Sequence, residues 1–220
     1  MRKKAKSCTN RSLTSALPIA LSLIVGLVTS ASARADALEE LVLLLADMHG
    51  FRANFLQTNL DARGDRLQTN SGEIVVQRPG KLYWHVAPPM EQIVVSDGEQ
   101  LWLYDPDLEQ VTVQQVSREL ADTPALLLSG EVELLRASYQ VVRLASEEDA
   151  TYFELFPHNP DSLFESLKLS FRDKTLVQMH IHDALGQRTS LDFSAIELNP
   201  KISAQRFEFT PPEGVDVITQ

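Results

Sequence analysis

Few residues in this chain have the type and spacing that metal chemistry requires. His180 and His182 stand two apart in a strand-like run, so their side chains share one face and could offer two metal ligands. No third ligand is indicated near them, and two histidines on an exposed strand are ordinary. Asp105-Pro106-Asp107 could suggest calcium, but the residues that follow lack EF-hand spacing, and a turn between strands explains them better. We therefore expect no metal site.

The sequence also lacks the motifs of common catalytic centres. There is no G-x-S-x-G elbow, phosphate-binding loop, dinucleotide fingerprint or H-E-x-x-H pair. Carboxylates are too frequent in this acidic chain to single out a glycosidase pair. The sequence thus predicts no catalytic residue, no cofactor and no enzymatic activity, and a lipid hydrolase in particular is disfavoured.

The N-terminal segment has the features of a signal peptide. Basic residues from Arg2 to Arg11 precede a short apolar run over residues 17–28, and Ala33-Arg34-Ala35 fits a cleavage site. The run is shorter than the roughly 20 residues that span a bilayer. We expect residues 1–35 to be a signal peptide and residues 36–220 to be a single periplasmic domain. The single cysteine, Cys8, precedes the apolar run, so the mature domain would have no disulfide and no lipid-attachment cysteine.

The predicted mature domain is strongly acidic. Cleavage removes six of the 20 basic residues and none of the 30 acidic ones, which changes the formal net charge from −10 to −16. Such a surface repels nucleic acids and anionic headgroups, so we expect no nucleic-acid partner. Without disulfides, stability must come from a hydrophobic core, for which about 185 residues suffice.

Apolar periodicity divides the domain into one helix and many strands. Leu38, Leu41, Val42 and Leu45 predict a helix with Asp36 as a candidate N-cap and Gly50 as its stop. Strand-like runs then follow at 51–58, 73–78, 81–87, 91–96, 100–105, 110–116, 138–145, 151–156, 164–171, 175–183, 187–198 and 207–209. Thr123-Pro124 begins a Leu-rich helical segment that a further turn or two of helix follows, up to residue 137.

Short connections between these strands predict antiparallel neighbours. We therefore expect an α+β fold: an incomplete, half-open antiparallel β-barrel of about ten or eleven strands with about three covering helices.

Several pieces of sequence resemble one family. They are Arg78-Pro79-Gly80-Lys81-Leu82-Tyr83-Trp84, the run 92–98 (QIVVSDG), the run 101–106 (LWLYDP), Glu109-Gln110-Val111, Thr123-Pro124, Gly186-Gln187-Arg188-Thr189 and the C-terminal F-x-F-x-P-P-x-G-V. Together they resemble the outer-membrane lipoprotein carrier family, LolA, over nearly the whole mature chain. Leu82 departs from the pattern, because some relatives carry an aromatic residue there.

The resemblance implies a periplasmic chaperone, and a carrier that binds its cargo one-to-one is expected to be a monomer. Such a protein accepts outer-membrane lipoproteins from an inner-membrane ABC transporter (LolCDE-like), shields their acyl chains in a cavity and delivers them to an outer-membrane receptor (LolB-like). A LolB-like receptor has a lipidated cysteine, which this chain lacks. The alternative is a periplasmic carrier or sensor of other lipids, phospholipid or glycolipid, on the same fold; a structural envelope protein is a more distant alternative.

The resemblance also implies a site. Arg78 would hold the lid helix at residues 123–129 by a hydrogen bond, as a latch on the empty carrier. Apolar residues of the strands and lid are the candidates for lining the acyl cavity. They are Leu82, Trp84, Met90, Trp102, Tyr104, Leu126, Leu127, Phe153 and Met179. The sequence leaves open which strand face lines the cavity.

Overall fold

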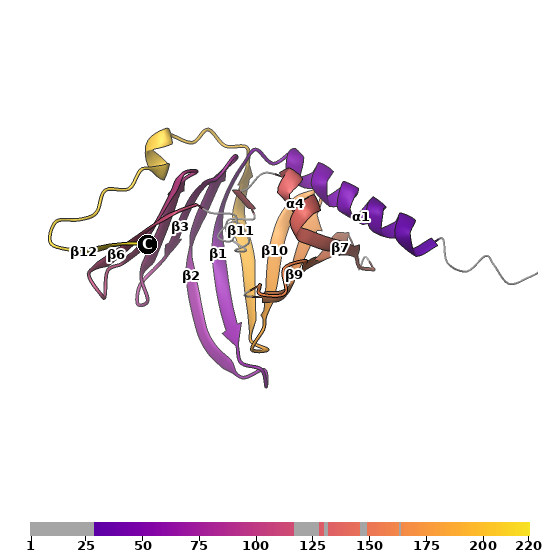
Figure 1. The fold of residues 1–220 in the computed structure, drawn as a ribbon, viewed down its shortest axis with the longest axis horizontal. Helices are drawn as coiled ribbons and strands as arrows, with labels where there is room; N and C mark the ends of the chain where they lie inside the picture. The colour runs from indigo at the N-terminus through magenta and orange to yellow at the C-terminus, as the bar shows by residue number, and fades with distance from the viewer. Residues whose placement is uncertain (1–28, 117–127, 130–131, 146–148, 163) are drawn as a thin grey trace, which may run out of the picture.

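A single, strongly curved sheet of twelve strands forms the body of the molecule (Figure 1). The structure is a computed structural model that describes residues 29–116, 128–129, 132–145, 149–162 and 164–220. For residues 29–36 and 132–134 it describes the backbone only. The strand order is β12-β6-β5-β4-β3-β2-β1-β11-β10-β9-β8-β7, so among the described strands β12 and β7 are the two edges, and they do not pair with each other to close the sheet. The expected half-open antiparallel barrel is confirmed, with one or two more strands than expected.

The strands lie close to the predicted runs. Their bounds are β1 Gly50–Leu60, β2 Arg66–Gln77, β3 Lys81–Val86, β4 Gln92–Asp97, β5 Gln100–Asp105, β6 Gln110–Gln115, β7 Tyr139–Arg143, β8 Ala150–Pro157, β9 Phe164–Arg172, β10 Thr175–Asp183, β11 Arg188–Leu198 and β12 Asp216–Thr219. Each neighbouring pair is antiparallel except β12 and β6, which are parallel. β12 was not predicted, and among the predicted strands β2 differs most in its bounds: it begins at Arg66 rather than Glu73 and makes a long hairpin with β1.

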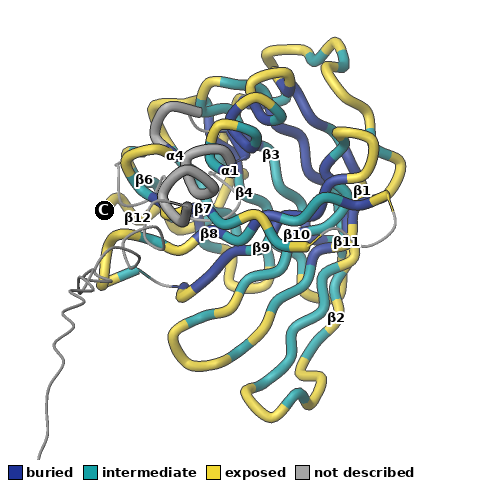
Figure 2. The backbone as a smooth tube through the Cα atoms, turned by 90° about the vertical axis from the view of Figure 1, so that its right-hand side faces the viewer, coloured by how far each residue is buried: buried dark blue, intermediate teal, exposed yellow. Residues whose placement is uncertain are grey.

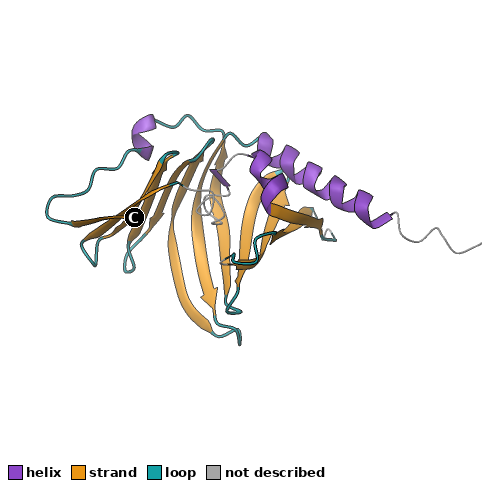
Figure 3. Cartoon of the chain, viewed as in Figure 1, coloured by secondary structure: helices purple, strands orange, loops and turns teal. Residues whose placement is uncertain are grey.

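Two α-helices are described, and both lie at one end of the sheet (Figure 3). Helix α1 covers Thr29–Ala46 and packs against β7 and against α4, Val132–Ser138. Asp36 lies inside α1, so its prediction as the N-cap is wrong: the helical segment continues upstream through small residues that tolerate helix. Within the described residues, no helix is long and apolar enough to cross a membrane.

The core lies between the inner, concave face of the sheet and the helices. Leu41 and Leu45 of α1 are fully buried against inner-face residues such as Phe51. Figure 2 shows buried stretches within the strands, whereas the turns between them are mostly exposed. Because side chains alternate across a strand, the partners of any one inner residue on neighbouring strands are inner too.

The C-terminal segment crosses the other side of the sheet. A short 3-10 turn, η1 (Ala204–Phe207), packs on β3 and β4, and β12 then adds to the edge of β6. The sequence predicted a strand at residues 207–209, which is wrong. Phe207 instead lies in η1, with only 1% of its surface exposed. Packing against the sheet buries this side chain without any strand pairing.

Candidate functional site

The inner face of β1 to β4 carries a row of apolar side chains next to Ser96 of β4. Leu82 is paired with Val76 of β2 and Ser96 of β4, and Trp84 is paired with Ile74 and Val94. Leu82 is 1% exposed, while Trp84 is partly buried against the core. Both predicted cavity residues of β3 therefore lie on the inner face of the sheet.

An aromatic stack extends this row to β1. The rings of Phe55 and Trp84 lie 4.1 Å apart between centroids and are nearly parallel. Gly72, between them on β2, leaves the room for this stack: a Cβ there would lie 2.6 Å from Cζ of Phe55 and 1.9 Å from the carbonyl oxygen of His85. No other residue type fits this position without displacing the backbone of β3.

The second half of the sheet continues the apolar surface. Phe153 on β8 is fully buried and makes an edge-to-face contact with Phe171, with centroids 5.9 Å apart. Met179 on β10 is also buried and is paired with Leu191 and Leu169. All of these belong to the same hydrophobic cluster as Leu82. The structure thus brings four of the nine cavity candidates, Leu82, Trp84, Phe153 and Met179, to one face.

Trp102 and Tyr104 lie on the opposite, outer face. Trp102 is paired with Val95 and Val113, which alternate with the inner residues of their strands. Both rings contact Phe209 of the C-terminal segment, at 6.5 Å and 5.9 Å between centroids. Their placement corrects the expectation that they line the cavity, since β5 carries apolar residues on both faces and alternation alone could not separate them.

The remaining three candidates differ in position. Met90 follows β3 in the turn to β4 and is 56% exposed, at the end of the sheet where the β1–β2 and β5–β6 turns also lie. Leu126 and Leu127 lie outside the described residues, as does most of the expected lid segment at residues 123–129.

Arg78 lies beneath the described end of that segment. Its Nε donates a hydrogen bond of 3.0 Å to the carbonyl oxygen of Leu128, which is fully buried in the core. Its Nη1 and Nη2 are buried with no hydrogen-bond partner within the described part of the chain. Burial lowers the pKa of the guanidinium to about 10, so the group is still charged at neutral pH.

Main-chain contacts hold the same two segments together. The backbone N–H of Gly80 donates to the carbonyl oxygen of Ser129 at 2.7 Å, and that of Arg78 donates to His49 at 2.9 Å. The turn between β2 and β3 is therefore a junction of three parts of the chain: the sheet, the start of β1 and the segment around Leu128. These main-chain bonds and the Arg78 side-chain bond join the sheet to the segment around Leu128.

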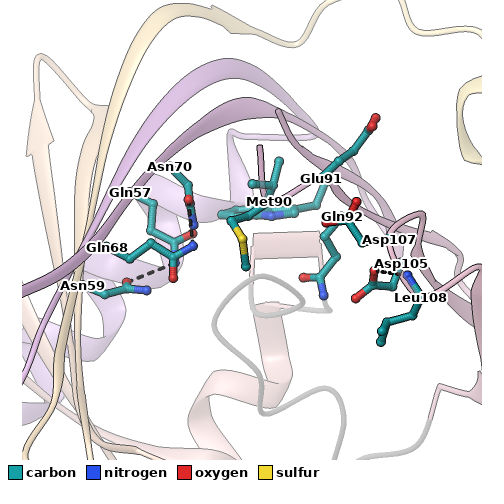
Figure 4. Close-up of a pocket in the computed structure, with 12 residues that line it drawn as sticks. Gln57, Asn59, Gln68, Asn70, Met90, Glu91, Gln92, Asp105, Asp107 and Leu108 are labelled. Atoms are coloured by element: carbon teal, nitrogen blue, oxygen red, sulfur yellow. Dashed lines mark hydrogen bonds between the residues drawn. The ribbon is translucent and has the colours of Figure 1, made fainter. Parts of the chain in front are cut away.

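Four carboxamide residues form a polar block that the sequence analysis did not identify. Gln57 and Asn59 of β1 are paired with Asn70 and Gln68 of β2, and all four line a pocket of about 440 Å³ (Figure 4). The signal was present in the alternation: the inner positions of β1 change from Phe55 to Gln57 and Asn59. It was missed because β2 was predicted to start only at Glu73.

The histidine pair lies away from this face. His180 is paired with Ser190 and Lys168, next to the outward-facing Gln178, and burial lowers its pKa. Across the residues for which the structure gives positions, no group of three or more potential ligands could hold a metal ion.

Comparisons with known proteins place the chain in one family. Residues 46–210 match the family model described as outer membrane lipoprotein carrier protein LolA. The outer-membrane lipoprotein carrier protein of Hahella chejuensis is 45% identical over 192 residues, covering 87% of this chain and 92% of that protein. That of Chromohalobacter salexigens is 43% identical over 202 residues, covering 92% and 96%.

Among solved structures, a LolA superfamily protein from Nitrosomonas europaea is similar with a TM-score of 0.47 and 14% identity, covering 80% of this chain and 98% of that one. The extent and identity of the match to the curated carriers are decisive. The chain belongs to the LolA family of outer-membrane lipoprotein carrier proteins.

Proposed function

We propose that this protein carries lipoproteins destined for the outer membrane across the periplasm and holds their acyl chains against its inner face. The observation that carries the proposal is the apolar inner face, covered by α1 and by the segment around Leu128 rather than by a second sheet. Helices attached over an open sheet can move away from it. They would uncover apolar surface without breaking the strand pairing.

The energetics fit a reversible carrier. Burial is worth about 0.8 kcal/mol per methylene, so a sixteen-carbon acyl chain represents roughly 10 kcal/mol of transfer free energy. In the empty protein, part of the inner face is already buried by Leu41, Leu45 and Leu128. The acyl chains would replace these contacts, so only the difference contributes to affinity, and the carrier can release its load to a better acceptor.

Arg78 is the proposed latch. Its bond to the Leu128 carbonyl joins the sheet to the covering segment. A hydrogen bond from a charged donor contributes roughly 1.5–3 kcal/mol. Loading must break it, so the closed state reduces the measured affinity for cargo.

The remaining parts of the proposal follow from the same function. Residues 1–35 act as a cleaved signal peptide, and residues 36–220 are a single periplasmic domain that works as a monomer. A LolCDE-like ABC transporter loads it and a LolB-like receptor unloads it. The transporter consumes ATP, so the carrier catalyses no reaction and needs no cofactor.

The test is a release assay. The mature protein is added to spheroplasts, and newly made lipoproteins are followed in the supernatant. The proposal predicts release as a soluble one-to-one complex with the carrier. If the folded protein released none but co-purified with phospholipid or glycolipid, the lipoprotein assignment would be wrong.

A further inference from the structure

The carboxamide block interrupts an otherwise apolar face. On β1, the inner positions Phe51, Ala53 and Phe55 are all buried, whereas Gln57 and Asn59, next in the alternation, are polar and partly exposed. On β2, the same change separates Ile74 and Val76 from the inner positions Asn70 and Gln68. The change occurs at the same level on both strands, because the two sets are in register.

The block forms one wall of a pocket that joins the apolar face. Its floor includes Trp84 and Val86, which also pack in or against the core. The opposite wall comes from the turns that follow β3 and β5, with Met90 between the amides and Gln92 in Figure 4. A volume of about 440 Å³ lies in the range of small-molecule sites, about 300–1,000 Å³.

The four amides have more hydrogen-bond donors and acceptors than the bonds between them use. Gln57 Nε2 donates to Asn59 Oδ1 at 3.1 Å, and Gln68 Nε2 donates to Asn70 Oδ1 at 2.9 Å. A carboxamide has two N–H donors and an oxygen with two lone pairs, so each of these bonds uses only part of what its partners offer. A mixed set of donors and acceptors suits a ligand with both, such as the ester and amide groups of an acylated peptide.

The charged residues at the opposite wall indicate which class of ligand the pocket can bind. Glu91, Asp105 and Asp107 line the pocket there, and no lysine or arginine is among its described lining residues. Glu91 is paired with His85 at 2.9 Å, and Asp105 accepts a bond from the backbone N–H of Leu108 at 3.1 Å. Carboxylates without a lining cation disfavour a phosphate group, so the pocket fits a neutral polar ligand better than an anionic headgroup.

We infer that this pocket is a polar subsite of the carrier: it binds the ester groups and first peptide groups of the cargo while the attached acyl chains lie on the apolar face beyond Trp84. The inference rests on the proposed function. It assigns the polar end of the cargo a place in the protein rather than leaving it in solvent.

The experiment compares two probes on the mature protein. One is a synthetic tripalmitoylated cysteinyl peptide of neutral sequence, and the other is hexadecanol, which has a chain but no ester or peptide group. The double variant Gln68→Met/Asn70→Leu removes two of the four amides of the block, those on β2, at similar volume. It should bind the lipopeptide about tenfold more weakly and bind hexadecanol as tightly as before or more tightly.

Two further variants complete the design. Gln178→Met changes an amide on the outer face, bonded to Asp192, and should alter neither affinity. Gln57→Met/Asn59→Leu tests the same wall from β1, so the inference stays testable if the β2 variant does not fold.

The outcomes separate the two proposals. Unchanged lipopeptide binding in both double variants, or an equal loss for both probes, would overturn the polar subsite. Failure of the wild-type protein to bind the lipopeptide at all would instead count against the carrier function.

Discussion

The substitution Arg78→Leu tests whether Arg78 acts as a latch on the closed carrier or only stabilises the fold. The change removes the guanidinium whose Nε bonds the Leu128 carbonyl at 3.0 Å. Losing a charge-assisted bond costs roughly 1.5–3 kcal/mol in the closed state.

The free energy of unfolding of the empty carrier should therefore fall by about the same amount. Cargo affinity should rise, because only the empty, closed carrier contains the bond. A contribution of 1.5–3 kcal/mol corresponds to roughly 10- to 100-fold tighter lipoprotein binding, and transfer to the receptor should fall by a similar factor.

The assay is lipopeptide titration, together with transfer of bound lipoprotein to receptor-containing membranes. Arg172→Leu, at an exposed arginine at the end of β9, is the matched control and should behave like wild type. If Arg78→Leu bound and transferred cargo as wild type does while remaining folded, the latch reasoning would be refuted.

Three other changes test different parts of the structure. Gly72→Ala should lower the free energy of unfolding by about 1–3 kcal/mol, measured by urea denaturation, because the new Cβ meets Phe55 and the β3 backbone; an unchanged midpoint would contradict the packing. Leu82→Glu should reduce lipopeptide loading at least tenfold, since a carboxylate on the inner face is desolvated by cargo; normal loading would remove Leu82 from the site. His180 has a pKa lowered by burial, so the native state binds fewer protons than the unfolded state, and stability falls as the pH drops through about 6.5. His180→Gln should flatten this loss between pH 7 and 5, and an identical pH profile would show that another group causes it.

Much of the fold followed from the sequence because the strands are short and their turns are marked. Pro79-Gly80 separates β2 from β3, Pro88-Pro89 separates β3 from β4, and Asp97-Gly98 marks the turn from β4 to β5. The bounds of β5 and β10 agree with the prediction. The start of β2 was missed because Arg66–Ser71 contains polar residues on both faces. Such a run has no hydrophobic alternation, and only pairing with β1 defines it as a strand.

The sequence predicted an apolar site on the strands, but it did not predict which face of each strand forms that site. β5 reads Leu101-Trp102-Leu103-Tyr104, which is apolar on both faces. Trp102 is on the outer face because the C-terminal segment covers that face with Phe209, a contact between residues far apart in the chain. Local periodicity contains no information on such a contact, so the two aromatic residues could not be assigned from sequence alone.

The central claim, that acyl chains lie on the inner face, can be tested by site-specific photo-cross-linking. A benzophenone side chain would replace Trp84 or Ile181 on the inner face, or Trp102 on the outer face, and each protein would be loaded with a lipopeptide bearing radiolabelled acyl chains. The carrier model predicts labelled adducts at Trp84 and Ile181 and none at Trp102. Adducts at Trp102 alone would contradict it and place the cargo on the other side of the sheet.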